Sequence, residues 1–246
     1  MVRNLLVRGM LAGLVAAVLA LVFAWVFGEP ELGRAIVLEG AHVGHAAEEA
    51  AEPEPFSRAV QSTVGLATAV GVYGVAIGGV FALVFAFAYG RLGALSARAT
   101  AALIALGAFV TVALVPFLKY PANPPGVGDP DSIRERTVVY FALVAGSVAL
   151  AAVALYLRRR LAPRYGGWNA TLLAVAAFLV AVTVACLLLP VIDGVPAHFP
   201  AVLLWRFRLA SLGTQVTLWA GVGLIFGPLA ERVLTSRYAP APALPA

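Results

Sequence analysis

The sequence predicts an all-α membrane protein, a polytopic bundle of six transmembrane helices. The first observation is composition: of 246 residues, 62% are hydrophobic and 12% are charged, and the mean hydropathy is +0.94. Soluble domains average about 45–50% apolar and about 25% charged residues. The second observation is six charge-free runs long enough to cross the hydrocarbon core as helices. Their Ala, Val, Leu and Gly content, without alternation, favours helices over barrel strands.

The runs place the expected spans along one transmembrane domain, residues 1–246. The first run follows Arg3 and Arg8 but is longer than the apolar part of a signal peptide, so we expect it to be retained. The second run exceeds one span, so part of it must be loop, tilt or interfacial helix. A disordered cytoplasmic tail is expected at 237–246. The expected spans are approximately 7–28, 62–90, 99–118, 136–157, 168–191 and 208–230.

The distribution of basic residues predicts that both termini are cytoplasmic. With six spans, the side that holds the termini carries ten of the 17 Lys and Arg residues, including Arg158, Arg159 and Arg160 in one short loop. Cytoplasmic loops are the ones that accumulate Lys and Arg. The outer side then carries all three histidines and 11 of the 12 acids. A negative outer mouth would concentrate cations, although acids are also free to gather outside without a function.

The first outer segment, 29–58, is the best candidate for metal binding. If 35–52 is helical, His42, His45, Glu49 and Glu52 share one face. Imidazole and carboxylate together suit first-row divalent metals such as Co²⁺, Ni²⁺ or Zn²⁺. A plain surface helix explains the same pattern. His198 and Asp193, in the last outer loop, are candidates for the same site.

The other outer segments carry a stiff loop and a polar stripe. Four prolines restrict the loop at 119–136, which would act as a lid or as a docking surface. We expect Ser132 and Glu135 to form a capping box for the following helix. Arg206 and Arg208 lie at the start of the sixth span and would pair with the acidic first outer segment, 29–58. Four uncharged polar residues would line a polar path or form helix–helix contacts. They are Gln61, Ser211, Thr214 and Gln215.

Several functional classes lack support in the sequence. The apolar runs contain no charged residue or histidine at depth, where pumps usually place such groups. No GxxxxGK[ST] or HExxH motif occurs, and we expect no enzymatic activity and no nucleic-acid binding. Because Cys186 is the single cysteine, one chain holds no internal disulfide and no CxxC pair. We expect no tightly bound cofactor.

Four segments together resemble the CbtA family of bacterial predicted cobalt transporter subunits. They are LLVRGMLAGLVAAVLALVFAWVFGEPELGRAI (5–36), VYGVAIGGVFALVFAFAYGRLG (72–93), FLKYPANPPGVGDPDSI (117–133) and LLWRFRLASLGTQ (203–215). The resemblance implies five to six helices, a role in cobalt supply for cobalamin, and a small single-span partner with a histidine-rich end, CbtB. It also implies acidic and histidine residues in the region of Glu39, His42 and His45.

Two functional hypotheses follow. In the first, the chain is a multi-pass permease of the bacterial inner membrane, and Co²⁺ is collected outside and driven inward by the membrane potential. In the second, the chain is a membrane scaffold that transports nothing alone and needs a metal-binding partner.

Overall fold

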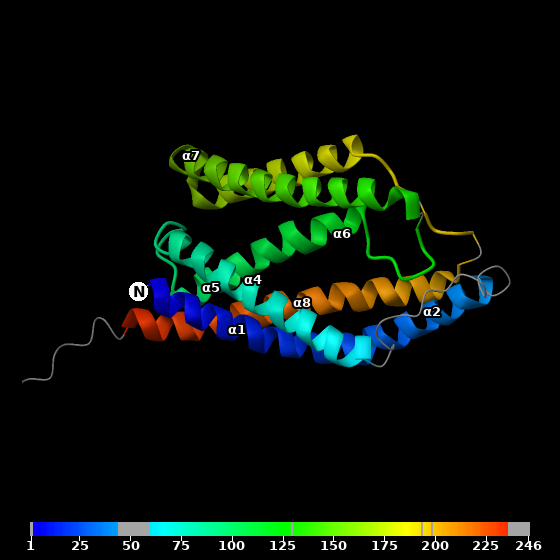
Figure 1. The fold of residues 1–246 in the computed structure, drawn as a ribbon. Coiled ribbons are helices and arrows are strands. Elements are labelled where there is room, and N and C mark those ends of the chain that lie inside the picture. Colours follow the sequence, from blue (N-terminus) through cyan, green and yellow to red (C-terminus); the bar gives the residue numbers. More distant parts are fainter. Residues whose placement is uncertain (1, 44–59, 129, 193, 198, 236–246) are drawn as a thin grey trace, which may run out of the picture. The chain divides into compact units, whose positions relative to one another are not determined.

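The structure is a computed structural model that describes residues 2–43, 60–128, 130–192, 194–197 and 199–235. Within these ranges it contains helices and loops and no strand, which confirms the predicted all-α class. The elements, shown in Figure 1, are α1 (Val2–Phe23), η1 (Ala24–Gly28), α2 (Glu29–Val43), η2 (Gln61–Gly65), α4 (Leu66–Ala88), α5 (Ala97–Ala108), η3 (Phe109–Leu114), α6 (Val115–Lys119), η4 (Pro130–Ser132), α7 (Ile133–Leu188) and α8 (Ala201–Thr235).

Five helical stretches of the described chain are long and apolar enough to cross a membrane. They are Val2–Gly40, Thr63–Ala88, Ala97–Lys119, Ile133–Leu188 and Ala201–Thr235. The fourth, α7, has 56 residues, more than twice what one crossing needs. Gly166 has non-helical angles (φ 78°, ψ 160°) and divides α7, which doubles back on itself in Figure 1. The two arms of α7 therefore account for the fourth and fifth predicted runs.

The helices extend beyond the apolar runs at several ends. The stretch 158–164, expected as a loop, is helical, and the chain turns only at Gly166. The first outer segment begins with α2, which continues directly from η1, and α8 begins at Ala201 rather than near 208. The hydropathy pattern shows where an apolar run ends and charged residues begin. A helix continues past that residue as long as its backbone hydrogen bonds are formed. The residues at which each span enters and leaves the bilayer stay predictions. The assignment of the chain to a single transmembrane domain also stays a prediction.

The chain forms two compact units. Unit 1 comprises Met1–Val26, Glu52–Leu106 and Gly213–Ala246, and unit 2 comprises Phe27–Ala51 and Gly107–Leu212. Three passages between the units lie inside helical stretches, at 26/27 in η1, at 106/107 in α5 and at 212/213 in α8. The fourth, at 51/52, lies outside the described residues. Each unit is described by itself below.

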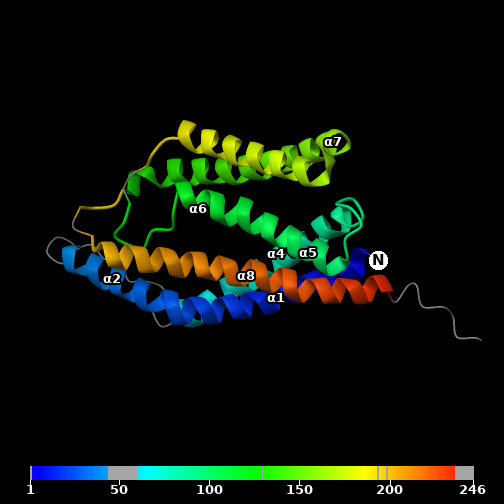
Figure 2. The ribbon, with the colours of Figure 1, turned by 180° about the vertical axis from the view of Figure 1, so that it is seen from behind.

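Unit 1 is built on close contact between α1 and α4. Gly9 and Gly13 of α1 lie against Gly78 and Gly74 of α4, and a Cβ added at Gly13 would lie 2.8 Å from the Gly78 Cα. Small residues allow such an approach of helix backbones in membranes. The neighbouring ends of α1 and α8 lie side by side (Figure 2), where Arg8 Nη1 donates to the Leu229 carbonyl at 2.7 Å.

Unit 2 has a core from α6 and both arms of α7. Val115, Leu143 and Val182 are buried there, and Cys186 packs against them as a small, half-buried side chain. Nearby, Ser147 is fully buried and its hydroxyl donates to the Thr111 carbonyl in η3. A π-helix disturbs the regular carbonyl pairing of an α-helix, and Ser147 supplies a donor at that point.

Candidate functional site

The first part of the candidate site is α2, where the sequence predicted a helix that carries metal ligands. Acidic residues Glu29 and Glu31 occupy its first turn, which continues the helix from η1. Because α2 also carries Arg34 and Glu39, whose side chains are costly in the hydrocarbon core, we expect it to lie outside that core. The helical prediction for 35–52 is confirmed as far as Val43, and the rest of that range lies outside the described residues.

Glu31 is held between two arginines of unit 2. Its carboxylate accepts from Arg34 Nη1 at 2.9 and 3.0 Å and lies 3.9 Å from Arg206 Nη1 on α8. The Glu31 side chain is 11% exposed, whereas both arginine side chains are 59% exposed. The arginine at the start of α8 therefore does pair with the acidic segment, as expected. A carboxylate neutralised in this way is a poor metal ligand.

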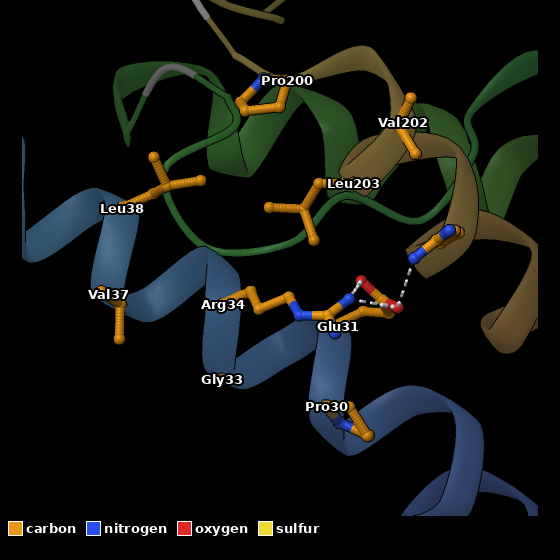
Figure 3. Close-up of a pocket in the computed structure, with 10 residues that line it drawn as sticks. Pro30, Glu31, Gly33, Arg34, Val37, Leu38, Pro200, Val202 and Leu203 are labelled. Atoms are coloured by element: carbon orange, nitrogen blue, oxygen red, sulfur yellow. Dashed lines mark hydrogen bonds and ion pairs between the residues drawn. The ribbon is translucent and has the colours of Figure 1, made fainter.

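A groove of about 680 Å³ lies between α2 and the first turns of α8, within unit 2. Its walls are mostly apolar, and Glu31 and Arg34 meet toward one end (Figure 3). Arg206 also lines the groove, close to Glu31. Leu38 and Leu203 point into the space between the helices in the same view. The remaining lining residues are Pro30, Gly33, Val37, Pro200 and Val202. This lining suits an apolar group with a polar end and does not suit a metal ion.

The proline-rich loop is fixed to its neighbours in unit 2. Arg208 Nη2 on α8 donates to Asn123 Oδ1 at 2.8 Å. Pro124 is fully buried, and its carbonyl accepts from the Val127 amide at 3.2 Å. The Gly128 amide donates to the Gly194 carbonyl at 2.8 Å. The loop is thus packed against neighbouring segments of unit 2.

Two glycines allow this path. Gly126 and Gly128 have φ values of +75° and +118°, a region that side chains with a Cβ avoid. A Cβ at Gly126 would lie 3.4 Å from the Glu39 Cβ, and one at Gly128 would collide with the Arg136 guanidinium. Both positions therefore require glycine for conformation, and at Gly128 the Arg136 guanidinium also occupies the space of a side chain.

Two further features of this region concern its polar groups. The capping box expected at Ser132 was wrong, because no side-chain capping bond forms there and the 3₁₀ turn η4 leads into α7 instead. The Tyr120 hydroxyl donates to the Pro190 carbonyl at 2.8 Å. Burial raises the pKa of Tyr120, with smaller contributions from Cys186 and Glu135.

Most of the predicted metal ligands cannot be placed. His45, Glu49, Glu52, Asp193 and His198 lie outside the described residues, and His42 is described only as a backbone position in the last turn of α2. In the part of the chain that is described, no three His, Cys, Asp or Glu side chains come together as a metal site. The proposed metal set therefore stays a prediction.

The predicted pathway residues are partly placed. Ser211, Thr214 and Gln215 are half-buried, and their spacing puts them on one face of α8. Gln61 lies in the π-helix η2, and its side chain is not described. The structure brings three of the four together on one helix and leaves their use in transport as a prediction.

Sequence reasoning missed three residues that the structure singles out. Glu31 is the partly buried carboxylate between two arginines, and the Glu31–Arg34 spacing of i, i+3 was the available signal. Ser147 is an isolated hydroxyl in an apolar run, which often marks a helix–helix hydrogen bond. Trp219 is 5% exposed, and its indole Nε1 finds no acceptor among the described residues.

The comparison with protein families decides the classification. The model of the family described as probable cobalt transporter subunit (CbtA) matches residues 2–231, nearly the whole chain. The chain belongs to the CbtA family. No curated protein and no solved structure shows a significant match. CbtA membership, together with the five apolar helices, makes this a membrane protein of a probable cobalt transport system.

Proposed function

We propose that this CbtA-family chain is the permease subunit of a divalent metal uptake system, with Co²⁺ as the transported ion. The observation that carries the proposal is the family match over residues 2–231, which includes four of the described span-capable helices whole and the fifth as far as residue 231. A transporter subunit that consists almost entirely of membrane helices is the part through which an ion would pass.

The proposed entry site uses the outer histidines and acids. His42, His45, Glu49 and Glu52 would collect the ion, with His198 and Asp193 as further ligands. Gln61, Ser211, Thr214 and Gln215 would supply uncharged oxygen and amide groups along the path. The described part of this set supports the proposal in two ways: α2 is a helix up to Val43, and the three polar residues of α8 share a face.

We place the chain in a bacterial inner membrane with both termini in the cytoplasm. In that orientation the negative potential inside the cell draws a cation inward. The drive is about 2.3 kcal/mol per charge per 100 mV, and therefore about twice that for a divalent ion. No tightly bound cofactor is needed for such a downhill movement, and a small single-span, histidine-rich subunit would act as partner.

The second candidate function is a scaffold that holds a metal-binding partner. The observation in its favour is that Glu31, a carboxylate of the outer segment, is neutralised by Arg34 and approached by Arg206. The two functions differ in whether this chain, expressed without a partner, moves metal.

The test is ⁵⁷Co²⁺ accumulation in cells that lack their own cobalt importers. A permease with the proposed site gives uptake that depends on the chain and falls by about tenfold or more in the His42→Ala/His45→Ala double variant, as for loss of metal ligands or their supports. The matched control is Glu135→Gln, an exposed acid of α7 outside the proposed set, which should leave uptake unchanged.

Uptake that is equal in the histidine variant and in the parent chain would overturn the proposed site and retain the permease. No uptake by a chain shown to be inserted in the membrane would overturn the permease and favour the scaffold.

A further inference from the structure

The groove between α2 and α8 leaves apolar side chains exposed. Val37 is 73% exposed and Val202 is 65% exposed, and both line the groove. Val37 lies between Arg34 and Glu39 on α2, which places this wall at or beyond the headgroups, since charged residues avoid the hydrocarbon core. Acyl chains do not extend to that level, so a protein surface is the cover that suits these residues.

The charged side chains at one end of the groove indicate the charge expected on a partner surface. Arg34 and Arg206 contribute two positive charges and Glu31 contributes one negative charge, so the end of the groove has an excess positive charge. The Glu31 carboxylate is nearly buried, whereas the two guanidinium groups remain more than half exposed. Guanidinium groups bind carboxylates in preference to other protein groups. The partner surface therefore has an acidic side chain at this end.

The shape of the groove fits a helix. Its walls are two helices, and the lining residues Pro30, Arg34 and Val37 follow one another at three- and four-residue intervals along α2. A third helix completes such a pair by laying apolar side chains spaced at i, i+3, i+4 and i+7 into the groove. Figure 3 shows the space between Leu38 and Leu203 into which these side chains would point.

We propose that this groove docks a helix of another subunit of the transporter, with an acidic side chain beside Arg34 and Arg206 and apolar side chains against Val37, Val202 and Leu203. The proposal rests on the proposed function only in that the chain works within an assembly. It does not depend on cobalt passing through this chain.

The first step of the test is photocrosslinking in the native membrane. A photoreactive amino acid replaces Val202 in the full chain, expressed with the other proteins of its transport system. We expect an adduct with one protein, and mass spectrometry of the adduct identifies the crosslinked helix and its acidic residue.

The second step is a charge exchange. The double change Arg34→Glu/Arg206→Glu should reduce the adduct by about tenfold or more, because like charges then face each other. Changing the partner's acidic residue to arginine should restore it. The matched control is Arg134→Glu, an exposed arginine of α7 outside the groove, which should leave the adduct unchanged. Cobalt uptake is measured in the same cells, so that loss of transport with an intact adduct is recognised as failure of the permease alone.

Three outcomes would overturn the proposal. They are an adduct with phospholipid, an adduct within this chain or with a second copy of it, and an adduct with another protein that does not respond to the charge exchange.

Discussion

Charged side chains at the α2 end of unit 2 are held by specific neighbours. Glu31 is paired with Arg34, Arg208 donates to Asn123, and Arg136 lies against Gly128. The first contact lies within α2, although Glu31 also lies 3.9 Å from Arg206 on α8. The other two contacts join a helix to the proline-rich loop. At the residue scale, the proposed metal binding therefore rests on His42 and on the histidines and acids after Val43, rather than on these paired charges.

The contact between Gly128 and Arg136 gives the first prediction. We expect Gly128→Ala to lower the free energy of unfolding by about 0.5–1 kcal/mol more than Gly93→Ala does, because a Cβ at Gly128 also displaces the flexible Arg136 guanidinium. Gly93 is the matched control, since its φ is +113° and its Cβ would meet nothing within 4 Å. Thermal unfolding in detergent measures both. Equal losses would show that backbone strain alone requires glycine at position 128.

Residue patterns predicted some of these contacts and not others. The pairing of Arg206 with the acidic segment could be anticipated, because opposite charges at adjoining helix ends are expected to meet. The burial of Glu31 and the bond from Arg208 to Asn123 could not, because they depend on how a turn far along the chain folds back onto α8. A single sequence carries no distance between such segments.

At the scale of the elements, hydropathy predicted the helices and missed their ends. Runs of apolar residues located every apolar helix of the described chain, including both arms of α7. The turn at Gly166 was not located, because Arg158–Arg164 reads as a charged loop although it continues the helix. The three π-helices η1, η2 and η3 were also missed, since a single inserted residue leaves no mark in an all-apolar run.

The close contact of α1 with α4 gives a second prediction. Gly13→Leu should force these helices apart and cost about 1–3 kcal/mol or prevent folding, as overpacking does. The matched control is Gly71→Leu in α4, where a Cβ meets nothing within 4 Å. The quantity to compare is the melting temperature of each purified variant. A Gly13→Leu chain as stable as Gly71→Leu would contradict this packing.

The bond from Ser147 to η3 gives a third prediction. Ser147→Ala should destabilise the chain by about 0.5–2 kcal/mol, because it leaves a buried carbonyl without its donor. Thr137→Ala is the control, since that exposed hydroxyl donates only to the Ile133 carbonyl of its own helix. Denaturant titration of both variants provides the comparison, and no difference between them would remove the assigned role of Ser147.

At the scale of the whole molecule, the charge distribution predicts orientation. Ten basic residues and one acid on one side face seven basic residues and 11 acids on the other, if six spans are assumed. The structure supports the helical stretches behind this count, including the division of α7 at Gly166. Family membership assigns the chain to the probable cobalt transporter subunits, which no single residue pattern could establish.

Orientation gives a fourth prediction. In a Cys186→Ser background, single cysteines replace Asp131 and Arg159, which the topology places outside and inside respectively. A membrane-impermeant maleimide added to intact cells should label the cysteine at 131 and not the one at 159, and should label both after the cells are opened. Labelling of position 159 alone in intact cells would reverse the assigned orientation and move the histidines to the cytoplasm.

The central claim is that this chain conducts a divalent metal. The most direct measurement uses the purified full chain in liposomes that contain a Co²⁺-sensitive dye, with a potassium gradient and valinomycin to set a negative interior potential. We expect Co²⁺ entry that requires the chain and increases with the imposed potential, since each divalent ion gains about 4.6 kcal/mol per 100 mV. Entry at the rate of protein-free liposomes, from chain that is inserted and folded, would contradict the claim.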